Sequence, residues 1–311
     1  MPVKSSNIVP KNSDGMSRYR VRCMTHGDLP QLMEIRREMK VHDVESCIDS
    51  WLTVDPRGIN VVESEEGEIV GACCFIRNSE DLYFGGLYCV RSKFQGSGLG
   101  IHVWNACMDH VGPMNAALNA VPGKMELYRD KSGFPIVETE FKCQKNYTSE
   151  PVDPNNLSNI IPQGVTIESV QEYNLPALFD YDFSVVGYDR KLALALNCQE
   201  ENSRTFVAVK NGACVGFGTI KLTCLGAGRV GPLYSDDSAV AEALLKTLIM
   251  SMPHVTGFVM NTVSSNVSAR RLLKKLGVPL KEELTRMYRK EKLVADTKKI
   301  FGLYELNLAP F

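Results

Sequence analysis

Short stretches of the chain alternate between apolar and polar residues, and others repeat apolar residues at the spacing of an α-helix. Such alternation is typical of a half-buried strand, and the longer period is typical of an amphipathic helix. In the first half, the predicted strands are residues 19–24, 59–64, 68–76, 82–90, 115–121 and 137–146. The predicted helices are residues 25–39, 44–52, 100–111 and 124–134. This order predicts an α/β (α+β) fold with an initial antiparallel hairpin and a later strand, loop, helix, strand unit.

The same pattern returns once, about 145 residues later. Four short matches keep the same order, pairing residues 27–32 with 173–178, 66–76 with 211–221, 85–92 with 231–238, and 131–135 with 275–279. Turn and helix-ending residues recur in any α/β chain, but four ordered matches at one spacing favour a duplication. We therefore expect two halves of similar fold.

A stretch rich in proline and asparagine, residues 146–164, separates the halves and has the composition of a linker. The first sixteen residues show neither the apolar run of a signal peptide nor the arginines of a transit peptide. The predicted organisation is a flexible lead-in at 1–16, a first domain at 17–150, a linker at 151–164 and a second domain at 165–311.

Composition limits the classes of partner. Thirty-five basic and thirty-six acidic residues give a net charge of −1, so no overall field attracts nucleic acid or an anionic membrane. The ten cysteines show no CxxC spacing and the five histidines no metal-ligand spacing, which predicts reduced thiols and no metal site. His102 and His110 are expected on the solvated face of the helix at 100–111. We expect a cytoplasmic protein that binds neither nucleic acid nor membrane.

Three glycines, at 96, 98 and 100, lie directly before this helix. Each glycine inside a helix costs about 1 kcal/mol relative to alanine, so a cluster at a helix start indicates a use for bare backbone. Free N–H groups at a helix N-terminus bind anions, and glycine lets a phosphate approach them closely. A dinucleotide fingerprint would need glycine where Ile101 or Val103 stands, and a Walker loop would need a Gly-Lys-Ser/Thr that is absent.

The remaining pattern, Gln95-x-x-Gly98-x-Gly100 after an alternating strand, resembles the acetyl-CoA-binding motif of the GNAT superfamily of acyltransferases. The resemblance implies two tandem GNAT-like domains, each a mixed, mostly antiparallel central sheet flanked by helices. It also implies acetyl-CoA as cosubstrate, with its pyrophosphate on the loop amides and its pantetheine along the preceding strand. The cofactor-binding residues that it implies are Tyr88, Cys89, Val90, Gln95, Gly96, Ser97, Gly98, Leu99 and Gly100.

The stretch LYRDKSGF, residues 127–134, is similar to the late helix of that family, in which a tyrosine protonates the departing thiolate. Tyr128 holds the matching place and is the catalytic residue that the resemblance implies. A tyrosine hydroxyl, with a pKa of about 10, can donate to a thiolate whose thiol has a pKa of about 8.5. The alternative is that Tyr128 only packs under Phe134.

The sequence does not identify the residue that acts as general base. Several family members carry a glutamate on the coenzyme-binding strand, and the corresponding position here falls near Phe84. Asp81, Tyr83 or Glu63 could act through water, but none stands out. Cys89 could accept the acyl group first, but a cysteine in an alternating apolar strand, without an activating histidine, is expected to be a packed side chain.

The second half has lost these features. Where the loop would lie, Asp236 and Asp237 place negative charge that opposes a pyrophosphate, so we interpret them as helix-capping residues. Leu272 stands in place of the tyrosine. Three stretches, at residues 185–190, 231–237 and 286–291, are similar to the second domain of tandem proteins of the YitH/HolE type. We expect this half to shape or cover the acceptor pocket, or to stabilise the first domain. Its candidate contacts are Asp189, Arg190, Arg286 and Tyr288.

The favoured function is an N-acetyltransferase. It would move an acetyl or other acyl group from coenzyme A to a small-molecule or protein amine, by direct attack in a ternary complex. The alternatives are a non-catalytic acyl-CoA sensor and an interaction protein that keeps only the fold. The intact loop argues against the last, and Tyr128 favours the enzyme over the sensor.

Overall fold

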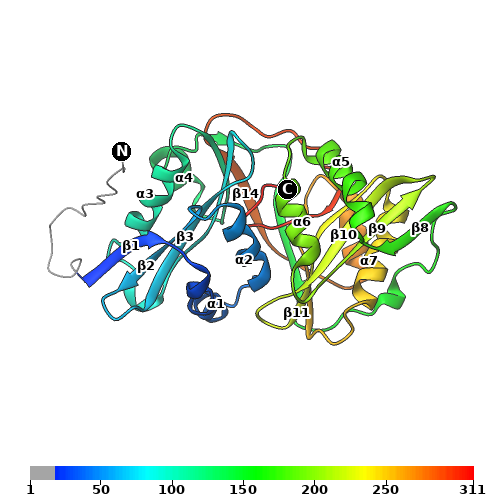
Figure 1. Ribbon diagram of the computed structural model, residues 1–311, viewed down its shortest axis with the longest axis horizontal. Helices are drawn as coiled ribbons and strands as arrows, with labels where there is room; N and C mark the ends of the chain where they lie inside the picture. The colour runs from blue at the N-terminus through cyan, green and yellow to red at the C-terminus, as the bar shows by residue number, and fades with distance from the viewer. Residues whose placement is uncertain (1–17) are drawn as a thin grey trace.

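The computed structural model describes residues 18–311, which form two similar α/β halves side by side (Figure 1). The first half contains β1 (Tyr19–Cys23), α1 (Leu29–Glu38), α2 (Glu45–Val54), β2 (Ile59–Ser64), β3 (Ile69–Arg77), β4 (Leu82–Val90), α3 (Leu99–Val111), β5 (Asn115–Ala120), α4 (Met125–Lys131), β6 (Ile136–Val137) and β7 (Cys143–Thr148). The second contains β8 (Val165–Ser169), α5 (Leu175–Val186), α6 (Lys191–Gln199), β9 (Ser203–Lys210), β10 (Ala213–Leu222), β11 (Ala227–Ser235), α7 (Ser238–Met250), β12 (Gly257–Met260), β13 (Thr262–Val263), α8 (Val267–Lys275), β14 (Leu280–Tyr288) and β15 (Ile300–Gly302). The predicted lead-in at 1–16 lies outside the described residues.

The order of elements in the second half repeats that of the first, which confirms the tandem fold expected from the sequence. Local sequence explains the boundaries. Before α1, the backbone N–H and the hydroxyl of Thr25 each donate to the Asp28 carboxylate at 2.8 Å. Between β9 and β10, Asn211 and Gly212 have φ values of 52° and 79°, a backbone conformation that these residue types favour in a tight hairpin turn.

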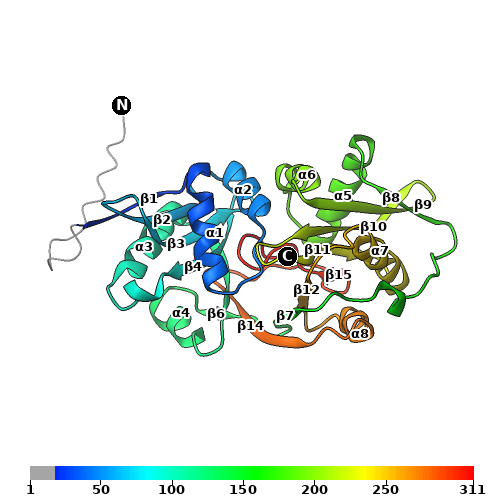
Figure 2. The same ribbon diagram turned by 90° about the horizontal axis from the view of Figure 1, so that it is seen from below.

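Helices cover both faces of the sheet, which explains why its inner strands are apolar throughout. Every residue of β2 is buried. Val61 packs into the core that includes α1 and α2, whereas Val62 packs with α3, because successive strand residues point to opposite faces. Figure 2 shows α2, α5 and α6 on one side of the molecule, and α4 and α8 on the other. Within residues 18–311, we find no helix that is both long enough and apolar enough to cross a membrane.

The two halves share one sheet because they exchange their last strands. Its strand order is β1-β2-β3-β4-β5-β14-β7-β12-β11-β10-β9-β8. β14, from the second half, pairs antiparallel with β5 of the first half, and β7, from the first half, pairs antiparallel with β12 of the second. β7 and β14 also pair with each other in the middle of the sheet. The domain boundaries near 150 and 165 stay a prediction, and each half's sheet is completed by a strand of the other.

Two of the residues expected to contact the first half, Arg286 and Tyr288, lie on the exchanged strand β14, and both are fully buried. The Nε of Arg286 donates to the side-chain oxygen of Asn119 at 2.7 Å, and its guanidinium lies 4.8 Å from the centre of the Phe84 ring. The Tyr288 hydroxyl donates to Glu138 at 3.1 Å. These two residues of the second half therefore stabilise the first.

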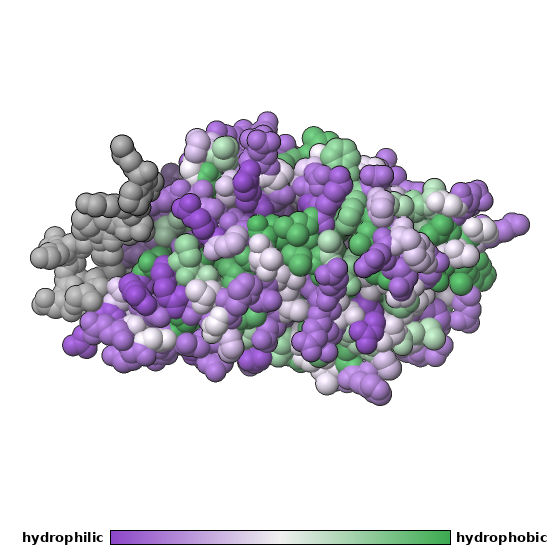
Figure 3. All heavy atoms as spheres, viewed as in Figure 1, coloured by the Kyte–Doolittle hydropathy of each residue, from purple (hydrophilic) through white to green (hydrophobic). Residues whose placement is uncertain are grey.

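After β15 the chain returns to the first half, where residues 303–311 are almost entirely buried. The side chains of Asn119 and Asn78 donate to the main-chain oxygens of Leu306 and Leu308, at 3.0 and 2.9 Å. Figure 3 shows apolar side chains gathered at the centre of the molecule, over the junction between α2 and α6. Buried contacts of the C-terminal segment therefore join the two halves.

Two local predictions are wrong. The strand predicted at 137–146 is divided into β6 and β7, because the Glu138 side chain accepts bonds from the N–H groups of Thr139 and Glu140, each at 2.9 Å, and the chain turns there. His110 does not lie on a solvated face: its Nε2 is 2.8 Å from a carboxylate oxygen of Asp55, and its side chain is 13% exposed.

Candidate functional site

β4 and β5 separate halfway along β4. Their parallel pairing ends at Gly85, although β4 continues to Val90. The ladder between β3 and β4 shifts register here and Leu87 has a φ of 52°, so a bulge follows directly after Gly86. A Cβ added to Gly86 would lie 2.3 Å from the main-chain oxygen of Asn307. The backbone at Gly86 is therefore approached closely by the chain's own residues near 307.

The glycine loop follows β4 and leads into α3. Gly96 and Gly98 have φ values of 80° and 88°, and a Cβ at either would meet no atom of residues 18–311 within 4 Å, so these residues leave the space in front of the loop open. Among residues 18–311, the N–H groups of Gly96 and of residues 98–100 have no hydrogen-bond acceptor. Unpaired amides at a helix N-terminus suit a phosphate. The loop therefore fits the pyrophosphate that the sequence pattern implies.

Tyr88 joins the loop to the bulged strand. It is 45% exposed, and a Cβ added to Gly100 would lie 2.4 Å from its hydroxyl, so the ring reaches across to the start of α3. The Gln95 side chain donates to the main-chain oxygen of Val90 at 3.0 Å, which ties the loop to the end of β4. Cys89 points to the opposite face, where it is buried with α1 and α2, and burial raises its thiol pKa. This agrees with Cys89 as a packed side chain.

Tyr128, on α4, lies against Trp104 of α3, with ring centres 5.6 Å apart. Trp104 also contacts Tyr88 edge to face at 6.0 Å, so the two tyrosines flank one indole beside the opening between β4 and β5. Tyr128 belongs to the same apolar cluster as Phe134, which agrees with the packing role as well. Burial raises the pKa of Tyr128 to about 12, and its hydroxyl stays protonated over the physiological range.

In the second half, a carboxylate already occupies the start of the corresponding helix, α7. The Asp237 side chain accepts bonds from the N–H groups of Ala239 and Val240 at 2.8 and 2.9 Å. Asp236 accepts from the Tyr181 hydroxyl at 3.0 Å and pairs with Lys299 at 2.9 Å. The capping role predicted for Asp237 is confirmed, and Asp236 is held by other partners.

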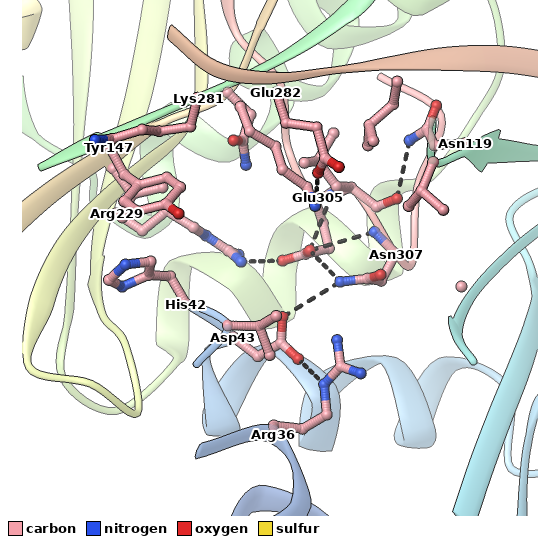
Figure 4. A pocket seen from close by; sticks show the side chains of 18 of the residues that line it. Arg36, His42, Asp43, Asn119, Tyr147, Arg229, Lys281, Glu282, Glu305 and Asn307 are labelled. Atoms are coloured by element: carbon pink, nitrogen blue, oxygen red, sulfur yellow. Dashed lines mark hydrogen bonds and ion pairs between the residues drawn. The ribbon is translucent and has the colours of Figure 1, made fainter. Parts of the chain in front are cut away.

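A cavity of about 400 Å³ lies between the halves and touches Gly85 and Gly86. This volume is in the range of small-molecule sites. Its lining residues with polar or aromatic side chains are Arg36, Lys40, His42, Asp43, Asn119, Lys145, Tyr147, Arg229, Asn261, Lys281, Glu282, Glu305 and Asn307 (Figure 4). They come from the end of α1, from β5, from the exchanged strands, from β11, and from the segments that follow β12 and β15. The cavity therefore exists only when both halves are present.

The cavity's three carboxylates are already paired with cations. Asp43 pairs with Arg36, Glu305 with Arg229, and Glu282 with Lys145. Glu305 also accepts bonds from the N–H groups of residues 306 and 307 and from the Asn307 side chain. Among the described residues, the Oδ1 of Asp43 receives one long contact, 3.3 Å from the side-chain nitrogen of Asn307.

The base candidates considered from sequence lie away from this cavity. Glu63 pairs with Arg20 and Arg22, which lowers its carboxyl pKa to about 2. Tyr83 packs its ring against His110, and Asp81 precedes β4 at the end remote from the bulge. None of the three lines the cavity.

Two family models match the chain. The Acetyltransferase (GNAT) family matches residues 27–134, and an Acetyltransferase (GNAT) domain matches residues 178–302. The chain belongs to the GNAT acetyltransferases. It carries two GNAT domains in tandem, it is an acyltransferase, and acetyl-CoA is its cosubstrate.

Individual relatives agree with this membership. The holothin acyltransferase of a Pseudoalteromonas species (strain SANK 73390) is 24% identical over 241 residues, which is 78% of each chain. A putative acetyltransferase from Pyrococcus horikoshii has the same fold, with a TM-score of 0.72, 18% identity and coverage of 98% of this chain and all of the other. A tandem GNAT protein from the clavulanic acid biosynthesis pathway has a TM-score of 0.60 and 11% identity, over 87% of this chain and 98% of its own.

Sequence reasoning found the loop of this GNAT protein but missed its cavity. The residues predicted to bind acetyl-CoA lie together at the end of β4 and the start of α3, and Tyr128 is joined to them through Trp104. The cavity residues come from six or more separate segments, none of which carries a motif. The available signal was weak: two consecutive glycines, Gly85 and Gly86, lie on the strand that the cavity touches, and paired glycines in a strand favour a bulge.

Proposed function

We propose that this protein is an N-acetyltransferase that transfers the acetyl group of acetyl-CoA to an amine bound in the central cavity, by direct attack in a ternary complex. The observation that supports it most is the relation between loop and cavity. The open loop continues the bulged strand β4, and the cavity touches the same strand at Gly85 and Gly86. Two substrates held at these places would meet at the bulge, and holding reactants in contact supplies much of the rate.

Acetyl-CoA supplies an acetyl thioester when it is bound. The free N–H groups of Gly96 and residues 98–100 would bind the pyrophosphate, assisted by Gln95 and Ser97 as the framework of the loop. Tyr88, Cys89 and Val90 would hold the pantetheine through their backbone along the unpaired edge of β4. These roles follow from the open edge and the free amides described above.

Tyr128 would donate its proton to the leaving sulfur. Its high pKa keeps the hydroxyl protonated, and the indole of Trp104 holds the ring beside the opening. A thiol that leaves in the same water-poor surroundings also has a raised pKa, which favours donation from a tyrosine.

Asp43 would take the proton of the attacking amine. Asp43 is a buried carboxylate of the cavity, with a side chain that is 8% exposed, and its partner Asn307 lies directly against Gly86. Glu305 has more donors, and the side chain of Glu282 is more exposed, at 34%. The amine would then lie in the cavity beside Asp43 and Asn307.

Replacing Asp43 by asparagine is expected to lower kcat by about 100-fold, the range of a lost general base. The KM for acetyl-CoA should stay within twofold, because Asp43 does not face the glycine loop. Initial rates of thiol release at saturating amine measure both. The matched control is Asp55→Asn, which also breaks a buried carboxylate pair in the first half but lies outside the cavity. Equal kcat values for the two variants would contradict the assignment.

One experiment separates the enzyme from the non-catalytic sensor. Thiol release from acetyl-CoA is measured with a panel of primary amines, alongside coenzyme A binding by calorimetry. Amine-dependent release with formation of the acetylated amine supports the proposal. Tight binding of coenzyme A without amine-dependent thiol release would contradict the proposal and favour the non-catalytic sensor.

A further inference from the structure

The cavity has more positive than negative groups. Its basic side chains, apart from His42, are Arg36, Lys40, Lys145, Arg229 and Lys281, and its acidic side chains are Asp43, Glu282 and Glu305. Each acid is paired with one base, as described above. Within residues 18–311, the ammonium groups of Lys40 and Lys281 have no carboxylate partner within 4 Å. The cavity thus carries two unmatched positive charges.

The charge of Lys281 lies away from the place where the amine would react. The Nζ of Lys281 is 5.5 Å from the centre of the Tyr147 ring. The His42 ring also packs against Tyr147, with ring centres 5.0 Å apart. Figure 4 shows Tyr147, Lys281 and His42 at one end of the cavity, and Asn119 and Asn307 towards the other. Asn307 is the residue that touches Gly86. The cavity is therefore polarised along its length.

Buried groups beside this end point to the same surplus. Arg229 is 3% exposed, and its Nε and Nη2 have no acceptor among the described residues. Burial lowers the pKa of His42, and Arg229 lowers it further against the opposing effect of Asp43. His42 is consequently neutral at pH 7 and adds no charge to neutralise. The described residues around Tyr147 therefore supply more positive than negative charge, and this end of the cavity suits an anion.

We propose that the acceptor carries an oxyanion, a carboxylate or a phosphate, in addition to its amine, and that Lys281 binds this group at the Tyr147 end of the cavity. Lys40 supplies the second positive charge, and the Tyr147 ring packs against the chain that joins the two ends. This inference rests on the proposed function, since it assigns the substrate class of the same site. It excludes diamines and polyamines as good acceptors, because a second ammonium group would meet Lys281.

The test compares acceptors that differ only at the end remote from the amine. Straight-chain ω-aminocarboxylates of three to six carbons are compared with alkylamines, diamines and aminoalkyl phosphonates of equal length, by kcat/KM for thiol release and by calorimetric binding. A charge-assisted contact predicts a 10- to 100-fold advantage for the anionic amines over the alkylamines. The carboxylate and phosphonate series show which oxyanion fits.

Lys281 is solvent-exposed, so its replacement leaves the fold intact. Lys281→Gln should lower kcat/KM for the anionic amines about tenfold relative to kcat/KM for the alkylamines of equal length. Lys281→Glu should reverse the preference in favour of diamines. Lys290→Gln is the matched control, because Lys290 is an exposed lysine beyond the end of β14 that does not line the cavity.

The outcomes separate this inference from the proposed function. Amine acetylation without an anion preference, a preference that Lys281→Gln leaves unchanged, or the absence of both binding and turnover for every anionic amine would overturn the inference. In the first two cases, N-acetyl transfer itself would still stand. Failure of the proposed function would show instead as no amine-dependent thiol release with any member of the panel.

Discussion

Replacing Gly98 by glutamate is expected to weaken coenzyme A binding by at least about 100-fold, the equivalent of 2.7 kcal/mol. A carboxylate at this position would face the pyrophosphate across the open space in front of the loop, where the wild-type chain offers only N–H groups. It would reproduce in the first half what Asp237 does in the second, where a side-chain carboxylate accepts the N–H groups of Ala239 and Val240. Calorimetric titration with coenzyme A measures the change.

The backbone strain of this substitution needs its own control. Gly98 has a φ of 88°, where a side chain costs about 1–2 kcal/mol of stability. Gly212, in the β9–β10 turn, has a φ of 79° and equally open surroundings, so Gly212→Glu carries similar strain without touching the loop. Gly212→Glu should lose comparable stability in urea and keep its affinity for coenzyme A. Unchanged binding in Gly98→Glu would refute the assignment of the loop.

Replacing Tyr128 by phenylalanine is expected to lower kcat by about 100-fold while the affinity for acetyl-CoA stays unchanged. The substitution removes one hydroxyl and keeps the ring that packs on Trp104, so stability should change little. Single-turnover rates and calorimetric binding separate the two effects. The sign of the pH dependence also follows. The protonated hydroxyl is the active form and its pKa is about 12, so Tyr128 causes no loss of activity between pH 7 and pH 10.

Tyr83→Phe is the matched control for this prediction. Tyr83 is a buried tyrosine of the same half, but it packs against His110 at the other end of β4. It should retain wild-type kcat. If Tyr128→Phe also retains it, Tyr128 serves only as part of the apolar cluster around Phe134, and the proton must reach the leaving sulfur from another donor.

The features that the sequence predicts correctly are those written in neighbouring residues. The glycine loop and the cap that Asp237 forms on α7 each depend on contacts within a few positions, and both are present. The residues predicted to bind acetyl-CoA lie in one place for the same reason, because they follow one another from strand to loop to helix.

The features that it misses depend on pairing between distant segments. The residues of β14, 280–288, do not by themselves specify β5 rather than β12 as the neighbouring strand. The strand exchange could therefore not be predicted from the sequence. The charge pairs of the cavity could not be predicted either. Arg229 and Glu305, for example, are 76 residues apart, and nothing in the sequence around either residue indicates its partner.

The exchange of β7 and β14 limits how this enzyme can open. Rotating one half away from the other would break backbone hydrogen bonds between β14 and β5 and between β7 and β12. The width of the acceptor cavity is consequently set by a continuous ladder rather than by a hinge, and substrates must enter past side chains and loops such as residues 40–43. A protease cut in the linker should leave two fragments that migrate as one particle and separate only on denaturation.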